Sequence, residues 1–138
     1  MKLHIQDLGK ENWEDVAYYY VKNNDGIFLV FDSSVKMKVK PYLNFYFRTI
    51  HQCNTEIPIL VVGNKNDLPV KVNINKIAQY ITKLGNNFIQ TSAKTGDNVG
   101  YAFKLLTSEV IKKKAAAKKL TTRNLEDDLY NIFTRYNL

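Results

Sequence analysis

Two short polar stretches hold the side chains in this chain that are best suited to chemistry. Asn64–Asp67 follows the apolar run Pro58–Gly63, and Ser92–Lys94 follows the shorter run Asn87–Thr91. A carboxylate such as Asp67 can accept two neighbouring N–H groups, which guanine presents on its ring N1 and its exocyclic amine. A site built around such hydrogen bonds rejects analogues that lack them by as much as about 10⁴-fold. The two stretches therefore predict a recognition site for a guanine base.

The other residues of these stretches suit the same ligand. The amide of Asn64 can contact ring N7 and tie neighbouring loops together, and the stem of Lys65 can lie across the base. The backbone N–H of Ala93 can donate to the guanine oxygen, where adenine carries a donor instead. A simpler interpretation is that Asn64–Asp67 only turns the chain after a strand, because Asn and Asp favour turns. The presence of a second polar stretch, Ser92–Lys94, after the next predicted strand favours the functional interpretation.

The elements that must position these residues alternate along the chain. Apolar runs with β-branched or aromatic residues predict strands at Gly26–Asp32, Pro58–Asn64 and Asn87–Thr91, and alternation predicts a half-exposed strand at Lys2–Ile5. Helical spacing is found at Trp13–Val21, Val39–Gln52, Ile74–Leu84 and Asn98–Lys119. This order predicts a three-layer α/β fold with a mainly parallel sheet and helices on both faces. Ligands of such sheets bind beyond the carboxyl ends of the strands, where both polar stretches lie.

The last segment of the chain has a different pattern. Its apolar residues recur at helical spacing and predict a C-terminal amphipathic helix: Leu125, Leu129, Ile132, Phe133 and Tyr136. We therefore divide the chain into an α/β domain, residues 1–119, and a helical extension, residues 120–138. The apolar side of the extension has two alternative destinations, the surface of its own domain or a partner protein.

The chain resembles a known family. Asn64–Asp67 matches the NKxD motif and Ser92–Lys94 the SAK motif of the Ras-like small GTPase superfamily, and the chain is most similar to the Rab group. Lys2–Glu11 resembles the family's KLxIWDTAGQE segment, and Tyr20 and Gly26 fall on matching positions. The similarity covers about the first 112 residues and only the latter two-thirds of the family pattern. It implies a truncated P-loop NTPase (small G-protein) fold that binds guanine nucleotide by descent, with these base-binding residues: Asn64, Lys65, Asp67, Ser92, Ala93 and Lys94.

The chain departs from the family pattern where the phosphates and the metal bind. The sequence contains no GxxxxGK[ST] phosphate loop and no switch I, and the segment Asp7–Gly9 is one residue shorter than the family's DxxG. In the family, Asp7 would bind Mg²⁺ through water and the Gly9 amide would contact the γ-phosphate. Lys10 stands in place of the glutamine that orients water, and an ammonium group is a donor only. We therefore expect no catalytic residue, no metal site and no tightly bound cofactor in this sequence, with GTP or GDP and Mg²⁺ only if the missing N-terminal part is supplied.

The absent first strand of the family leaves three alternatives for the sheet. Lys2–Ile5 could pair directly with Ile27–Phe31 to give four strands, a partner chain could add a strand, or the sequence could be an incomplete copy of a longer GTPase.

Composition excludes several classes of protein. No apolar run reaches the roughly 20 residues that a membrane span needs, and the N-terminus has no apolar signal region. The only cysteine, Cys53, leaves no site for prenylation near the C-terminus. The net charge of +7 is concentrated in Lys112–Lys119, which favours a solvated helix end over an anionic partner. No aromatic residues lie between these lysines, so nucleic acid is not the expected partner. These features predict a cytoplasmic protein.

Three functional hypotheses remain. The first is a Rab-like protein-interaction module, incomplete at its phosphate site, whose partner surface combines Trp13 and Tyr20 with the apolar residues of the C-terminal helix. The second is an active GTP-hydrolysing switch in vesicle trafficking whose N-terminal part is absent from this sequence. The third is a structural subunit of a larger assembly.

Overall fold

The structure is a computed structural model that describes residues 3–9 and 12–118. The described elements alternate in chain order: α1 (Trp13–Asn23), β1 (Ile27–Asp32), α2 (Val39–Cys53), β2 (Ile59–Asn64), α3 (Ile74–Lys83), β3 (Asn87–Gln90) and α4 (Val99–Lys118). The three strands form one parallel sheet in the order β1-β2-β3. The predicted α/β class is therefore confirmed, with bounds that agree within a few residues.

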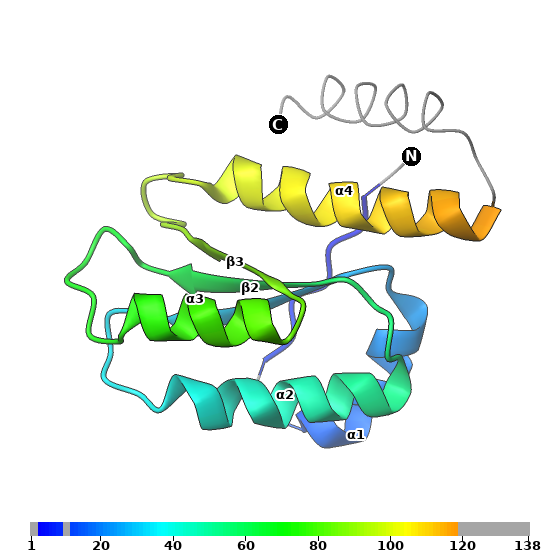
Figure 1. Ribbon diagram of the computed structural model, residues 1–138, viewed down its shortest axis with the longest axis horizontal. Coiled ribbons are helices and arrows are strands. Elements are labelled where there is room, and N and C mark those ends of the chain that lie inside the picture. The colour runs from blue at the N-terminus through cyan, green and yellow to red at the C-terminus, as the bar shows by residue number, and fades with distance from the viewer. Residues whose placement is uncertain (1–2, 10–11, 119–138) are drawn as a thin grey trace.

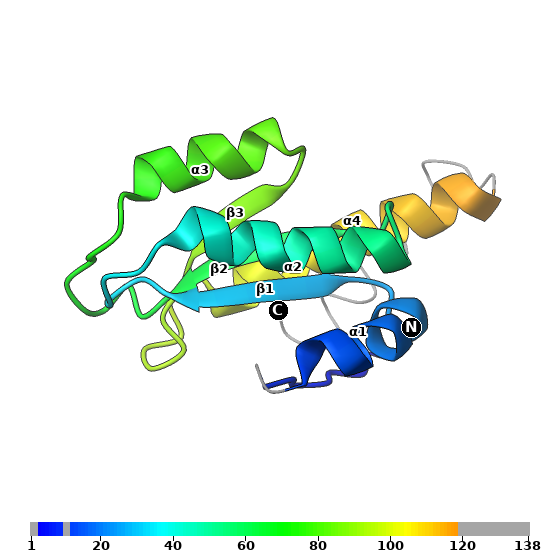
Figure 2. The same cartoon turned by 90° about the horizontal axis from the view of Figure 1, so that it is seen from below.

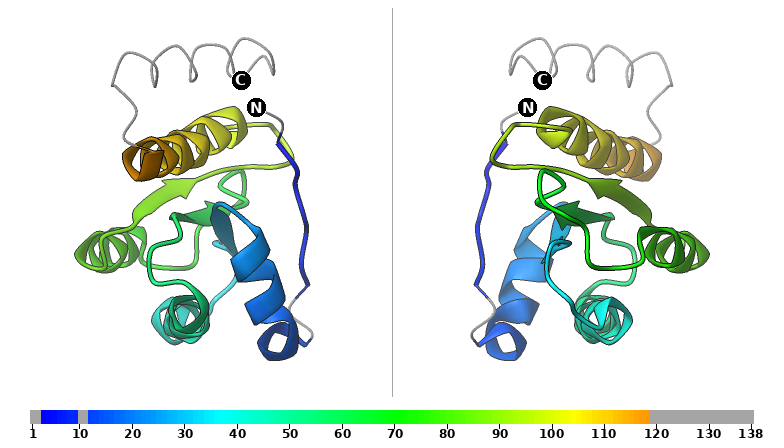
Figure 3. Two further views of the ribbon diagram at one scale, coloured as in Figure 1. Left: turned by 90° about the vertical axis from the view of Figure 1, so that its right-hand side faces the viewer. Right: turned by 90° about the vertical axis from the view of Figure 1, so that its left-hand side faces the viewer.

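The sheet is the middle of three layers (Figure 1). Helices α1, α2 and α3 cover one face and α4 covers the other, as the end-on views of Figure 3 show. Strand β2 lies in the centre and is buried along Ile59–Gly63, because a strand between two helical layers exposes neither of its faces. The central strand therefore holds the polar residues that follow it at the carboxyl edge.

Alternate residues of β2 contribute to two hydrophobic clusters. Ile59 and Val61 pack with α1, α2 and α3, in a cluster whose most deeply buried members include Leu43, Ile50 and Ile81. Leu60 and Val62 point to the other face and pack against Ala102 and Leu106 of α4. This alternation follows from the two-residue period of a strand. No described helix is long and apolar enough to cross a lipid bilayer.

The predicted strand Lys2–Ile5 is not observed in its described part. Residues 3–9 form an extended segment without strand pairing, which runs past the sheet from the α4 side to the α1 side (Figures 1 and 3). Ile5 is 71% exposed, so the segment gains too little burial to add a strand. The alternative of a four-stranded sheet formed by this segment is therefore wrong.

The outer edge of β1 is closed in part by a side chain. Ile27 donates its backbone N–H to the Pro58 carbonyl just before β2, and Ser33 donates to the Asn64 carbonyl at the end of β2. Phe28, Val30 and Asp32 therefore direct their N–H groups to the other edge. There the hydroxyl of Tyr42 donates to the Val30 carbonyl at 2.8 Å. Among the described residues no strand pairs with this edge.

Some predicted surface residues lie elsewhere. Trp13 is 9% exposed and packs against Tyr46 with ring centroids 5.5 Å apart, so it belongs to the core and not to a partner surface. Tyr20 is half-buried, while its neighbours Tyr18 and Tyr19 are exposed. The remaining predicted partner residues, Leu125, Leu129, Ile132, Phe133 and Tyr136, lie outside the described residues.

Candidate functional site

The candidate site lies at the carboxyl edge of the sheet. Strand β1 ends at Asp32, β2 ends at Asn64, and the loop after β3 begins at Thr91. These ends are adjacent because the three strands are parallel and in register. Figure 2 shows the arrowheads of the strands at one end of the sheet, with the loops that follow them. The fold therefore brings both polar stretches together from different parts of the chain.

Asn64 joins the two stretches through its side-chain oxygen. Its Oδ1 accepts the backbone N–H of Ala93 at 3.0 Å and the hydroxyl of Thr91 at 3.1 Å. With Oδ1 engaged as an acceptor, Nδ2 is the atom that can donate to a ligand. The predicted role of Asn64 in tying neighbouring loops corresponds to this geometry. The Ala93 N–H is already used, so a ligand carbonyl there would share or exchange that hydrogen bond.

Asp67 is positioned by a buried serine. The Ser92 hydroxyl, which is fully buried, donates to Asp67 Oδ1 at 2.6 Å, whereas Asp67 itself is exposed. The loop below is closed by the backbone bond from Gly96 N–H to the Ser92 carbonyl at 2.9 Å and by the 2.5 Å bond from Asn66 Nδ2 to Asp97 Oδ2. The carboxylate therefore faces solvent with a fixed orientation. Lys94 lies exposed on the same loop.

Lys65 is held by an acid from the neighbouring strand. Its Nζ lies 2.5 Å from Asp32 Oδ2, and its backbone has φ of 67°. The hydrogen bond from Lys65, together with those from the hydroxyl and the backbone N–H of Ser34, lowers the pKa of Asp32 to about 2. The ion pair fixes the lysine stem across the edge that joins the ends of β1 and β2.

Gly63 makes room for two aromatic rings beside the site. Phe31 and Phe88 lie nearly parallel, with centroids 6.1 Å apart and an interplanar angle of 8°. A Cβ at position 63 would lie 3.2 Å from the Phe31 ring and 3.3 Å from the Phe88 ring. The glycine before Asn64 therefore permits the aromatic packing that supports the end of β2.

The predicted phosphate and metal region is separate from this arrangement. Gln6 Oε1 accepts a hydrogen bond from Asn24 Nδ2 at 3.0 Å, which anchors the first segment near the amino end of β1. Asp7 and Gly9 are exposed, and no described hydrogen bond joins them to the guanine stretches; Lys10 lies outside the described residues. Within residues 3–9 and 12–118, no cluster of three or more His, Cys, Asp or Glu could hold a metal ion. We derive no step through a metal ion at this segment.

Sequence reasoning missed several residues that organise the site. Asp32, which accepts a hydrogen bond from Ser34, pairs with Lys65; Thr91 donates to Asn64, and Asp97 accepts from Asn66. The available signal was position, because Asp32 follows a buried strand just as Asn64 does. What could not be read from the sequence was which lysine Asp32 would contact.

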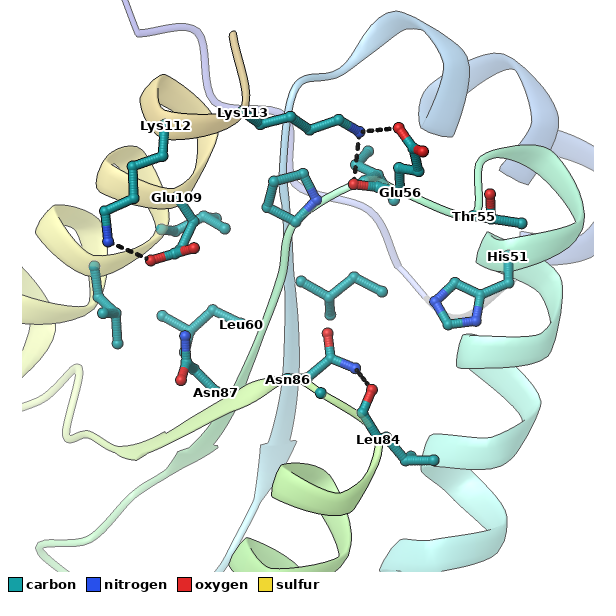
Figure 4. A pocket seen from close by; sticks show the side chains of 16 residues that line it. His51, Thr55, Glu56, Leu60, Leu84, Asn86, Asn87, Glu109, Lys112 and Lys113 are labelled. Carbon is teal, nitrogen blue, oxygen red and sulfur yellow. Dashed lines mark hydrogen bonds and ion pairs between the residues drawn. The ribbon is translucent and has the colours of Figure 1, made fainter. Parts of the chain in front are cut away.

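A hollow lies at the opposite end of the sheet and carries no comparable chemistry. It encloses about 430 Å³ near the start of β2, with Pro58, Leu60 and Asn87 in its wall. Figure 4 shows Lys112 paired with Glu109 and Lys113 paired with Glu56 at its rim. The lysine run at the end of α4 is thus partly neutralised by ion pairs.

Comparison of the chain with known proteins identifies a family and relatives. The model of the Ras family matches residues 1–112. The chain is 33% identical over 112 residues to Ras-related protein Rab-5B of Plasmodium falciparum (isolate 3D7), across 80% of this chain and 54% of the relative. It is 32% identical over 123 residues to Ras-related protein SEC4 of Saccharomyces cerevisiae, across 87% of this chain and 56% of the relative. The chain spans about half the length of these relatives.

Proposed function

The chain belongs to the Ras family, near the Rab group, and from this membership we propose that its 138 residues recognise a guanine base without holding the phosphates. Members of the family bind GTP or GDP with Mg²⁺. The observation that carries the proposal is that Asn64 Oδ1 accepts both the Thr91 hydroxyl and the Ala93 N–H. These two hydrogen bonds hold the loop after β2 and the loop after β3 together, so the donors and acceptors of both loops keep fixed positions relative to one another.

The proposed contacts follow from the donors and acceptors. Asp67, oriented by Ser92, accepts the ring N–H and the exocyclic amine of guanine. Asn64 Nδ2 donates to ring N7, and the Ala93 N–H donates to the guanine oxygen by sharing its bond to Asn64. The stem of Lys65, whose Nζ is held by Asp32, supports the face of the base. Adenine would place a donor against the Ala93 N–H and is rejected for that reason.

The proposed affinity is low because the base alone contributes. A guanine of about 11 heavy atoms, at about −0.3 to −0.5 kcal/mol per atom, binds with about −3 to −5 kcal/mol. This free energy corresponds to a dissociation constant near the millimolar range. Phosphate-loop amides and Mg²⁺ supply most of the affinity in P-loop proteins, and the 138 residues contain no sequence for that loop.

A protein-interaction role is the biological function that we attach to this domain. Its support is the exposed aromatic side of α1, where Tyr18 is 59% and Tyr19 is 64% exposed. Trp13 is not part of this surface because it is buried. The domain division at residue 119 and a cytoplasmic location stay part of the proposal, and the apolar side of the C-terminal segment keeps its two alternative destinations, its own domain or a partner.

A second candidate is an active GTP-hydrolysing switch completed by residues outside this sequence. The observation that favours it is coverage, since the matches span only 54% and 56% of the two relatives. The structural-subunit hypothesis has no specific observation in its favour.

Two measurements test the proposal. In an NMR titration, guanosine should shift the amides of residues 64–67 and 92–94 with a near-millimolar dissociation constant, while adenosine should not. Asp67→Ala should abolish the guanosine shifts, and Asp25→Ala at the opposite end of the sheet should leave them unchanged. Equal shifts with adenosine would contradict base recognition. Denaturing the purified chain and chromatographing the released nucleotide is the second measurement, because stoichiometric GDP or GTP would require a phosphate site within these 138 residues and would contradict the proposal.

A further inference from the structure

Helix α4 is buried on two opposite sides. Ala102 and Leu106 face the sheet and belong to its second hydrophobic cluster. Ile111 follows Ala102 by about two and a half turns, since an α-helix has 3.6 residues per turn, so it points away from the sheet. Yet Ile111 is only 4% exposed, and Ala115, one turn further on, is 7% exposed.

Thr107 extends this second side toward the start of the helix. It precedes Ile111 by one turn and is 6% exposed, so Thr107, Ile111 and Ala115 form an outer stripe at i, i+4 and i+8. A stripe at this spacing is the pattern of a helix face that packs against another element. Among residues 3–9 and 12–118, no helix or strand lies on that side of α4 (Figures 1 and 3).

We propose that the outer stripe is the docking site for this chain's own segment 124–136. The segment carries Leu125, Leu129, Ile132, Phe133 and Tyr136 at helical spacing and is separated from the end of α4 by five residues. As a helix it would extend about 18 Å, enough to cover a stripe of about 12 Å at 1.5 Å per residue. The five residues 119–123 that would connect it to α4 fall within the usual length of a helix–helix connection.

Charge favours an antiparallel arrangement of the two helices. A tight return would place Glu126, Asp127 and Asp128 beside the last turns of α4, where Lys112, Lys113 and Lys114 are found. These lysines already pair with Glu109, Glu56 and Asp25, so the acidic residues would add to an existing network of charges. Acidic residues in the first turn of a helix are also favourable for its own dipole. The apolar residues Ile132, Phe133 and Tyr136 then reach back toward Thr107.

The test uses the full chain with a single introduced thiol. In a Cys53→Ser background, Ala115→Cys places a thiol in the stripe, and Ala116→Cys places a matched thiol at an exposed neighbour. A thiol under the docked segment reacts only through local opening, so position 115 should react with Ellman's reagent at least about tenfold more slowly than position 116. Equal rates at the two positions would overturn the proposal.

The occupant is identified by changing the segment itself. Phe133→Glu should accelerate labelling at position 115 about tenfold by undocking the segment, whereas Asn131→Glu, on the polar side with the same added charge, should leave the rate unchanged. Protection that survives Phe133→Glu, or that is lost on dilution of the protein, would assign the cover to another element or to a second copy and refute the proposal. If Ala115→Cys fails to fold, hydrogen exchange of the α4 amides at 107–115, with and without Phe133→Glu, gives the same discrimination.

Discussion

The side-chain oxygen of Asn64 accepts the backbone N–H of Ala93 at 3.0 Å, so the last residue of β2 fixes the loop that follows β3. The same oxygen accepts the Thr91 hydroxyl, which sets the direction of the remaining amide nitrogen. A base that binds here meets donors and acceptors already arranged by the protein. Such pre-organisation lowers the entropy that binding must offset.

Replacement of Asn64 should therefore loosen the site and the fold together. Asn64→Ala leaves the buried Thr91 hydroxyl and the Ala93 N–H without their acceptor, and we expect a loss of about 1–3 kcal/mol in the free energy of unfolding. Urea denaturation measures this loss. Asn75→Ala, at an exposed position of α3, is the control and should change stability by less than about 0.5 kcal/mol. An unchanged free energy of unfolding in Asn64→Ala would show that the hydrogen bonds of Asn64 do not stabilise the fold.

The ion pair between Asp32 and Lys65 should give stability a specific pH dependence. The pKa of Asp32 is lowered from 3.8 to about 2 in the folded protein, so the folded state binds this proton less readily than the unfolded chain. Its stabilising effect is complete above about pH 5 and is lost as the pH falls toward 2. Unfolding curves of the parent and Asp32→Asn proteins should differ at neutral pH and converge near pH 2. Parallel curves over this interval would argue against the pair.

Tyr42 should stabilise the free edge of β1. Tyr42→Phe removes the donor to the Val30 carbonyl and should lower the free energy of unfolding by about 0.5–1.5 kcal/mol. Tyr19→Phe, at an exposed position of α1, should have no comparable effect. Burial, and then the neighbouring Tyr46, raise the pKa of Tyr42 to about 12, so the unfolded state releases this proton first. The parent protein should lose stability between pH 10 and 12, and Tyr42→Phe should lose less.

Ser92 should influence ligand binding through Asp67. Ser92→Ala removes the 2.6 Å hydrogen bond that orients the carboxylate, and the guanosine dissociation constant should rise about tenfold, which corresponds to about 1.4 kcal/mol. NMR titration of the variant measures this change. Ser108→Ala, on α4, is the control. An unchanged constant would show that Asp67 needs no buried support.

The strand and helix order could be predicted because local patterns dominate there. The apolar runs at 26–32, 58–64 and 87–91 are stable only when they are buried, which makes them strands of the core. Gly85, with φ of 74°, follows the end of α3 as expected. The motif residues could be placed at one edge because parallel strands share an edge. Each of these inferences needs only the residue types of a short stretch of sequence and the general rule for parallel sheets.

The described part of the predicted strand Lys2–Ile5, residues 3–5, is not a strand for a non-local reason. Its alternation is compatible with pairing, but a strand forms only where another strand accepts it, and Val30 at the edge of β1 already accepts the Tyr42 hydroxyl. The position of Trp13 was likewise undecided by sequence, since an aromatic residue at helical spacing suits both a core and a partner surface. The contact with Tyr46, more than thirty residues away, decides it.

The central claim is that these residues recognise a base and do not hold a triphosphate. Calorimetric or NMR titration of the purified 138-residue chain with GTP, in Mg²⁺ and then in EDTA, tests it most directly. We predict a dissociation constant near the millimolar range for GTP and for guanosine alike, unchanged by removal of Mg²⁺. Submicromolar, Mg²⁺-dependent binding of GTP by this chain alone would contradict the account.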